Sequence, residues 1–501
     1  MVRRSEPVRA AAVSVRDSLK RLSGDSLVYG LGQVGGKVVN LLLVPVLTRM
    51  LVPQQYGVAD LVTAYSASVL LVLVFGMDGA LARFFYEQTD REARIRMASS
   101  SFVWRVVTGS ALALLLALFA EPLSARLLGG VVYAKYLRIG AFTIPFTLLT
   151  LFANDVLRVT FQPWKFITLN VSQTLLVGGL TLYFVLVHHL GVAGALYGKL
   201  IGDAIAAALG IVLCRHSLRP RFSRTTLRQM LAFGLPLVPV AISYGVIGLV
   251  DREALQRTAS HDAVGVYGVA MKFFAVITMG VQAFNLAFGP FAYMRARDPD
   301  APRLYARVFA LYLGLASFGA LVVGVFAPGI VAVMTTPRYA AAAAPALWLA
   351  FAAVAQGAYS IAVLGITLSL RTSLLGGIAA VTALVAIVAN QVLTPRLGAE
   401  GAAMSTFLAH ATSSLLAYIV AQRVRPFPYR GARLAVLFTG ALALGVGAVR
   451  FSPPGMQGLA VKLGAVLAFV ALAAALEIWS DRGAVRHGPA PGSGGGTQGG
   501  S

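Results

Sequence analysis

Fourteen long apolar runs, separated by short polar connections, limit what this chain can fold into. Each run suits a helix that crosses a bilayer, for which about 17–25 residues are needed. Backbone amides in lipid must be satisfied within such segments, which favours helices. We therefore predict an all-α polytopic membrane protein with about 14 transmembrane helices. The runs lie at 26–48, 58–81, 101–120, 137–157, 165–187, 192–213, 230–250, 264–292, 305–327, 341–367, 374–394, 400–422, 434–449 and 459–479.

The composition supports lipid as the solvent. Hydrophobic residues make up 58% of the chain and charged residues only 12%, whereas soluble domains have about 25% charged residues. The single cysteine, Cys214, excludes an internal disulfide and a cysteine-based zinc site. We predict no metal and no cofactor. The net charge of +23 comes without a nucleic-acid-binding motif, so we expect no nucleic-acid partner.

The distribution of Lys and Arg predicts the orientation. These residues concentrate in every second connection, with about three times as many on the side that includes the N-terminus as on the other. Short cytoplasmic loops carry this excess in membrane proteins. We therefore expect a multi-pass protein of the bacterial inner membrane with both termini in the cytoplasm.

Two halves of the chain share a pattern. Gly30 precedes Arg49 by nineteen residues, and Gly234 precedes Arg252 by eighteen. An even number of runs separates the copies, which predicts two pseudo-symmetric, parallel lobes of six helices each. The predicted organisation is a basic tail at 1–25, an N-lobe at 26–213, a basic linker at 214–229, a C-lobe at 230–422, two further helices within 423–480 and a disordered Gly-rich tail at 481–501.

Three short motifs resemble those of a known family. They are Thr48–Arg49–Met50–Leu51 with Tyr56–Gly57, Gly76–Met77–Asp78–Gly79–Ala80 with Arg83–Phe84–Phe85, and Asp251–Arg252 with Gly265–Val266–Tyr267 and Lys272. At these places the chain resembles bacterial oligosaccharide (O-antigen-type) flippases of the multidrug/oligosaccharidyl-lipid/polysaccharide exporter superfamily.

The resemblance implies two six-helix lobes around a central cavity, with two extra C-terminal helices. It also implies translocation of undecaprenyl-diphosphate-linked oligosaccharides for surface polysaccharide assembly, by lobes that rock about a central site. A polysaccharide polymerase would then be a partner, and the protein would not be an enzyme.

Four cations are candidate ligands for a diphosphate. Lys37 lies ~16 Å from either end of the first run, too far for its stem of about 6 Å to reach water. It must face a wet cavity or a partner. Lys272 is its candidate counterpart in the second lobe, the alternative being a lysine near the outer interface. Arg49 and Arg252 lie just beyond their runs and are candidates at the outer mouth, although Arg252 could simply pair with Asp251.

Three carboxylates are candidates for ion coupling, because charges inside a bilayer are costly and suggest function. They are Asp203, Asp251 and Asp78. Asp203 shares a helix face with Lys199, four residues away, so a self-neutralised pair is the simpler interpretation. For Asp78 with Arg83 the simpler interpretation is a pair at a helix end, and the same holds for Asp155 with Arg158.

Other functions remain open at this stage. A multidrug/cation antiporter of the same fold would use buried carboxylates, whereas Lys37 favours an anionic substrate. A flippase for the peptidoglycan lipid precursor is a second alternative. A membrane glycosyltransferase, polymerase or ligase would need catalytic carboxylates or a large extramembrane loop, and we see neither.

Overall fold

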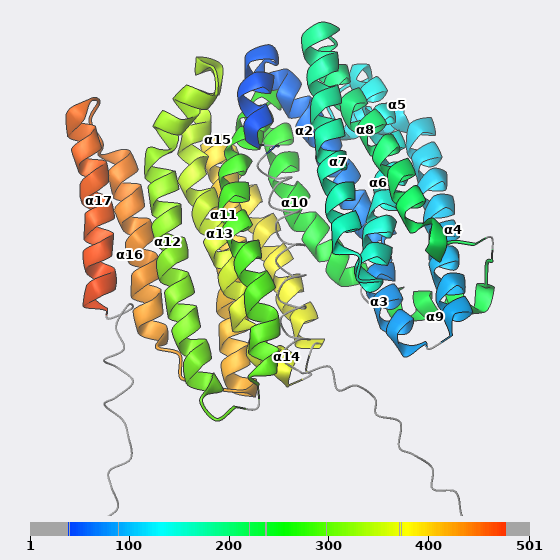
Figure 1. Cartoon of the computed structure of the whole chain (residues 1–501). Helices are drawn as coiled ribbons and strands as arrows, with labels where there is room; N and C mark the ends of the chain where they lie inside the picture. Colours follow the sequence, from blue (N-terminus) through cyan, green and yellow to red (C-terminus); the bar gives the residue numbers. More distant parts are fainter. Residues whose placement is uncertain are drawn as a thin grey trace, which may run out of the picture.

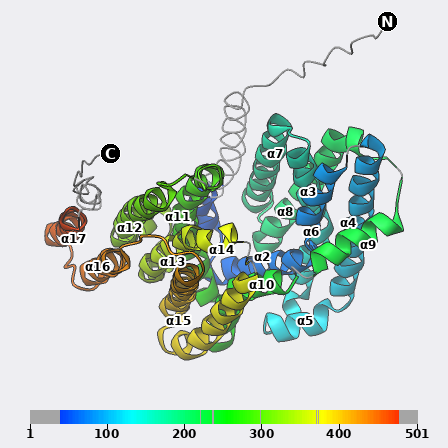
Figure 2. The same ribbon diagram turned by 90° about the horizontal axis from the view of Figure 1, so that it is seen from below.

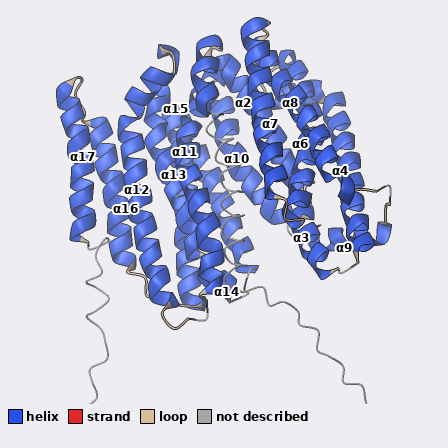
Figure 3. Ribbon diagram, in the orientation of Figure 1, coloured by secondary structure: helices blue, strands red, loops and turns tan. Residues whose placement is uncertain are grey.

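The computed structural model describes residues 39, 41–88, 90–219, 221–235, 238–296, 298–369, 371 and 373–476. Within these ranges every regular element is a helix (Figure 3). Eleven helices are long and apolar enough to cross a membrane. One of them, Ser373–Val424, is divided at Gly398 (φ 57°, ψ −131°) into two arms that match two of the predicted runs. With Leu41–Met50 and Val238–Thr258, each of the fourteen predicted runs overlaps a described helix, although the first and the seventh runs do so only in part.

The first half of the chain supplies one group of helices. It comprises Leu41–Met50, α2 (Pro53–Leu73), α3 (Met77–Glu87), α4 (Arg91–Leu118), α5 (Ala120–Leu127), η1 (Val131–Tyr133), α6 (Ala134–Val159), α7 (Pro163–Leu182), η2 (Tyr183–Val187), α8 (Gly191–Cys214), η3 (Arg215–Ser217) and α9 (Arg224–Gly234).

The second half supplies the other group. It comprises α10 (Val238–Thr258), α11 (His261–Met294), α12 (Ala301–Met334), η5 (Pro337–Ala342), α13 (Ala343–Ala362), α14 (Leu364–Leu368), α15 (Ser373–Val424), α16 (Gly431–Arg450) and α17 (Met456–Ala475).

The two groups stand side by side, with α2 and α10 between them and α16 and α17 at one edge (Figures 1 and 2). The end of the bundle where α10 passes to α11, α12 to η5 and α16 to α17 is called the upper end, as in Figure 1. The opposite end, with α3, α9 and α14, is called the lower end. The orientation predicted from Lys and Arg makes the lower end cytoplasmic.

Local chemistry sets several helix starts. Pro53 and Pro163 occupy the first turns of α2 and α7, where a missing amide hydrogen costs nothing. The Asp90 carboxylate caps α4 by accepting from the amides of Glu92 and Ala93. Ser223 caps α9 by accepting from the amide of Thr226.

A reciprocal glycine contact joins the two halves at the upper end. A Cβ on Gly57 of α2 would lie 2.1 Å from the carbonyl oxygen of His261, and one on Gly265 of α11 would lie 1.9 Å from that of Pro53. Each glycine therefore contacts the carbonyl group of the residue that precedes the other glycine by four positions. Such a self-complementary contact is what a two-fold axis produces, and these glycines open equivalent helices of the two lobes. The pseudo-symmetry predicted from the sequence is thus visible in the packing.

The seventh predicted run, 230–250, is displaced in the structure. Residues 224–234 form α9, a separate helix that buries Leu227 and Met230, and the membrane helix occupies Val238–Thr258 instead. The amphipathic pattern of α9 explains the difference, because it packs along the lower end of the first group. There Gly234 touches the break between α2 and α3, where its Cβ would lie 2.0 Å from the Phe75 carbonyl oxygen.

Several predictions fall outside the described residues. They are the basic tail at 1–25, the Gly-rich tail at 481–501 and Lys37. The domain boundaries as a whole stay a prediction.

Candidate transport site

Charged side chains from both halves meet between the groups, at what we call the interlobe cluster (Tyr56, Asp60, Arg252, Tyr267 and Lys272). Arg252 Nε donates to Asp60 Oδ2 at 2.6 Å, and both side chains are mostly buried. Its guanidinium also lies 5.9 Å from the centre of the Tyr267 ring. Arg252 therefore pairs across the lobes with Asp60 rather than with its neighbour Asp251.

A second interlobe contact joins the same two helices. The Tyr65 hydroxyl of α2 donates to the Glu253 carboxylate of α10. Glu253 is in turn paired with Arg257 on its own helix. Together with the Asp60–Arg252 pair, this contact ties α2 to α10 toward the upper end.

Lys272 lies well inside the bundle. It lies eleven residues beyond the start of α11 at His261, a rise of ~16 Å. Its ammonium group donates to the Tyr56 hydroxyl and is close to the Asp60 carboxylate.

An apolar space lies beside Lys272. A cavity of about 210 Å³ lies between the helix Leu41–Met50, α11 and α12. Lys272 and Thr335 line it together with apolar side chains such as Leu41, Phe273 and Val323. One cation at the margin of an apolar space suits a ligand with an anionic head and a hydrocarbon tail.

Asp251 is the centre of what we call the Asp251 ring (Asp251, Tyr267, Asn390 and Thr406). Its side chain is buried, and its carboxylate accepts from the Tyr267 hydroxyl at 2.6 Å, from Asn390 Nδ2 at 2.7 Å and from the Thr406 hydroxyl. The donors come from α11 and from both arms of α15. They are all neutral, so they satisfy the carboxylate without cancelling its charge.

The carboxylate and hydroxyl oxygen atoms of the Asp251 ring are hard ligands, of the kind that bind hard cations in proteins. The described residues contain no group of three His, Cys, Asp or Glu side chains that could hold a metal ion.

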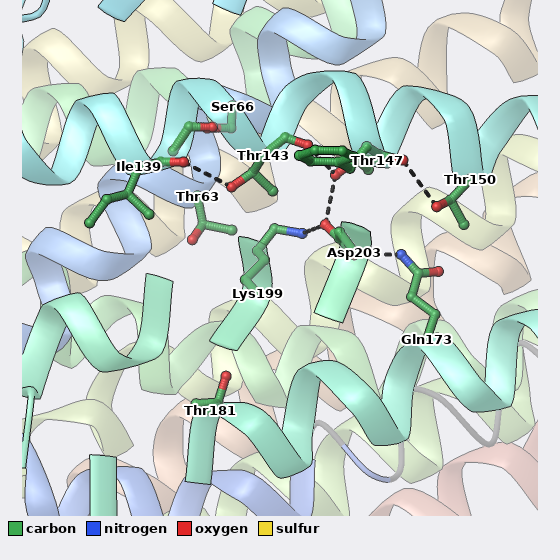
Figure 4. A network of polar contacts seen from close by, with 12 residues as sticks. Thr63, Ser66, Ile139, Thr143, Thr147, Thr150, Gln173, Thr181, Lys199 and Asp203 are labelled. Atoms are coloured by element: carbon green, nitrogen blue, oxygen red, sulfur yellow. Dashed lines mark hydrogen bonds and ion pairs between the residues drawn. The ribbon is translucent and has the colours of Figure 1, made fainter. Parts of the chain in front are cut away.

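Asp203 is the centre of a separate network in the first lobe (Figure 4). Its buried carboxylate accepts from Lys199 Nζ and from the Thr147 hydroxyl, both at 2.7 Å, and from Gln173 Nε2 at 2.8 Å. The predicted Lys199–Asp203 pair is thus present, and α6 and α7 supply the additional donors. This carboxylate is already neutralised by a cation, unlike Asp251.

A fully buried arginine lies in the lower half of the first lobe. Arg105 of α4 is 0% exposed, and its Nη2 donates to Asp155 Oδ2 of α6 at 2.7 Å. The other oxygen of Asp155 accepts from Arg158 at 2.9 Å. The predicted Asp155–Arg158 pair therefore exists, but it is half of a larger cluster.

The remaining candidates lie at the ends of the bundle. Arg49 is exposed at the upper end of the helix Leu41–Met50. Asp78 is exposed in the first turn of α3. The expected Asp78–Arg83 pair is wrong, because Arg83 Nε donates to Glu87 at 3.1 Å. Arg83 and Glu87 are one helical turn apart on the outer face of α3.

Sequence reasoning missed several members of these clusters. Asp60, Tyr65, Arg105, Asn390 and Thr406 went unnoticed as site residues. Asp60 and Arg105 carried a usable signal, since both charges fall within or beside predicted membrane runs. Nothing in the sequence marks Asn390 or Thr406 among the many polar residues of membrane helices.

Comparison with known proteins agrees with this architecture. A family model described as "Polysaccharide biosynthesis protein" matches residues 23–291. "Lsg locus putative protein 1" of Haemophilus influenzae is 22% identical over 277 residues, which cover 54% of this chain and 65% of that relative. The chain thus spans slightly less than two thirds of this relative.

The solved structures share the fold. "Lipid II flippase MurJ, inward closed conformation" matches with a TM-score of 0.70 and 14% identity, over 89% of this chain and 98% of that one. An inward-facing multidrug resistance MATE family transporter of the MOP superfamily matches with a TM-score of 0.64 and 15% identity, over 77% and 94%. The MATE multidrug transporter DinF-BH matches with a TM-score of 0.57 and 17% identity, over 85% and 99%.

The fold is therefore that of membrane flippases and transporters of the MOP superfamily. Because the family model covers more than half of the sequence and the motifs around Arg49 and Arg252 lie within it, the chain belongs to the polysaccharide biosynthesis protein family.

Proposed function

We propose that this protein is a flippase that moves an undecaprenyl-diphosphate-linked oligosaccharide across the bacterial inner membrane, for surface polysaccharide assembly. The observation that carries the proposal is the position of Lys272, the member of the interlobe cluster that also lines an apolar cavity. A diphosphate can pair with the cation while a polyprenyl chain occupies the apolar side. Lys37, outside the described residues, is the proposed second cation.

The mechanism that we propose is alternating access. In the present arrangement the Asp60–Arg252 pair, the Tyr65–Glu253 bond and the Gly57–Gly265 contact hold the two lobes together at the upper end. Opening toward that side would separate all three. An arriving diphosphate would compete with Asp60 for Arg252 and Lys272. Its binding would therefore weaken the contacts that hold the lobes together at the upper end.

For the energy source we propose ion coupling at Asp251. Its carboxylate is buried and accepts hydrogen bonds only from neutral donors, so an incoming proton or monovalent cation would not have to displace a hydrogen-bonded cation there. Asp251 adjoins Arg252 in sequence and shares Tyr267 with the interlobe cluster. A proton or cation bound in the Asp251 ring would therefore alter the surroundings of the Asp60–Arg252 pair, which holds the lobes together at the upper end. Asp203 and Asp78 remain weaker candidates.

The decisive test is transport in reconstituted vesicles. A fluorescent undecaprenyl-diphosphate oligosaccharide should cross in the presence of the wild-type protein, and Lys272→Gln should slow it by about tenfold or more, whereas Lys272→Arg should retain much of the rate. Thr335→Val, on the same cavity wall, is the matched control and should change the rate little.

The alternatives predict other outcomes. Movement of the peptidoglycan lipid precursor alone would favour that flippase activity. Efflux of a cationic dye without movement of any lipid-linked sugar would favour a drug antiporter and refute our proposal. Since the family and fold are those of transporters, we expect the sugar to emerge chemically unchanged.

A further inference from the structure

The upper end of the last two helices encloses a cavity that the transport proposal does not use. It measures about 430 Å³ and lies between the end of α12, the turn that joins α16 to α17, and the first turns of α17. Phe326, Pro328, Val449 and Leu459 supply apolar walls, and Lys462 is the charged residue that lines it. In Figure 1 this pair of helices forms the outer edge of the bundle, away from the space between the lobes.

The cavity has a fixed shape. The turn contains Pro453 and Pro454, and the Ser452 hydroxyl donates to the Gly458 carbonyl at 3.0 Å. Gly458 packs so closely that a Cβ there would lie 1.9 Å from the Pro453 carbonyl oxygen. The turn is thereby held onto α17, and the cavity walls are preformed.

Lys462 lacks an acidic partner in these walls. It is the seventh residue of α17, ~9 Å along the helix from Met456, and it is half-buried. The described segments of α12, α16 and α17 contain no Asp or Glu at all. A charge at this depth in a membrane helix needs a counter-charge, and these three helices supply none.

An apolar stripe leads away from the cavity. Leu459 is 41% exposed, Leu463 48% and Leu467 68%. They follow one another at intervals of four residues, so they share one face of α17 and continue the cavity wall down the helix.

We propose that this cavity binds an anionic phospholipid, with the phosphate on Lys462 and an acyl chain along the Leu459–Leu467 stripe. The combination of a single cation and a continuous apolar face matches a lipid better than a free phosphate ion. A lipid held in this place would fasten α16 and α17 to α12. The site is separate from the transport route, so its test is independent of the proposed function.

The test measures lipid binding to the purified full-length protein. Native mass spectrometry with dioleoylphosphatidylglycerol should show a bound lipid, and Lys462→Gln should reduce its occupancy at least about fivefold. Lys462→Arg keeps the charge and should retain the lipid. Lys135→Gln is the matched control, since Lys135 is an exposed lysine at the upper end of the first lobe.

A second arm separates the lipid from its headgroup. The double variant Leu463→Asn, Leu467→Asn should weaken phosphatidylglycerol binding, and millimolar inorganic phosphate should not displace the lipid. Wild-type lipid occupancy in Lys462→Gln would overturn the proposal. Full displacement by inorganic phosphate, with no effect of the leucine substitutions, would also overturn it and would indicate a simple anion site.

Discussion

Asp155 illustrates how single residues keep charge inside this bundle. It lies between Arg105 at 2.7 Å and Arg158 at 2.9 Å, and Arg105 is completely buried. Within the described part of the chain, Arg105 Nε and Nη1 find no other hydrogen-bond partner. The carboxylate is therefore the main compensation for a desolvated guanidinium, and its loss would leave a buried charge unpaired.

We predict that Asp155→Asn destabilises the protein by about 3–5 kcal/mol, the usual cost of breaking one side of a buried ion pair. Thermal unfolding in detergent would show this as a lowered Tm. Glu87→Gln is the control, because it removes only an exposed pair with Arg83, worth about 0–1 kcal/mol. Equal effects of the two substitutions would contradict the assigned role of Asp155.

A second prediction at this scale concerns ion coupling through Asp251. Asp251→Asn keeps the size of the side chain but removes the charge that a proton or cation would neutralise. Transport driven by an imposed ion gradient should fall about tenfold or more, while binding of the lipid-linked substrate persists. Flux measured with proton and sodium gradients in turn would identify the ion. An unchanged response to both gradients would exclude Asp251, and Asp298→Asn, on an exposed loop, is the control.

At the scale of elements, the crossing of α2 and α11 depends on two glycines. Gly57 and Gly265 bring the backbones together, so that neither position has room for a methyl group. The neighbouring Asp60–Arg252 pair joins the same α2 to α10, the helix that precedes α11. The geometry of this pair therefore depends on this close approach.

We predict that Gly57→Ala or Gly265→Ala forces the upper ends of the lobes apart. Spin labels on the exposed positions 126 of α5 and 338 of η5, in a Cys214→Ser background, should report a longer distance between the lobes. Gly179→Ala is the control, because a Cβ there would meet nothing within 4 Å. Unchanged distances in both variants would show that the contact does not hold the upper end closed.

At the scale of the whole molecule, the two lobes form a two-state element biased by the contacts between them. The Asp60–Arg252 pair joins residues 192 apart in sequence. It exists only when the upper ends are together. Its loss should therefore favour the opposite, upper-open state without unfolding either lobe.

We predict that Asp60→Asn shifts the equilibrium toward the upper-open state by about 1–3 kcal/mol, or roughly five- to 150-fold. The same pair of spin labels would report the populations. The charge swap Asp60→Arg with Arg252→Asp should restore part of the closed state. If the swap behaves like the single substitution, the pair is not the closing contact.

Local patterns were sufficient for much of the architecture. Hydropathy predicted the helices, because each membrane helix must satisfy its own backbone and so reveals itself in sequence. A repeated pattern predicted the two pseudo-symmetric lobes, and the resemblance of three short motifs predicted the superfamily. The 230–250 run failed because α9 interrupts it. Helical spacing also identified Lys199–Asp203, whereas the pair expected for Asp78 and Arg83 did not form.

The partners of the central charges depended on tertiary structure. Arg252 has a charged neighbour in sequence, yet it pairs with Asp60 of the other lobe, and Asp251 is held by side chains from α11 and α15. Composition, helix positions and the need for buried charges to find partners follow from the sequence, because they depend on local hydrophobicity. Which partner each charge finds was decided by the packing of the lobes, because that packing brings together residues more than a hundred positions apart.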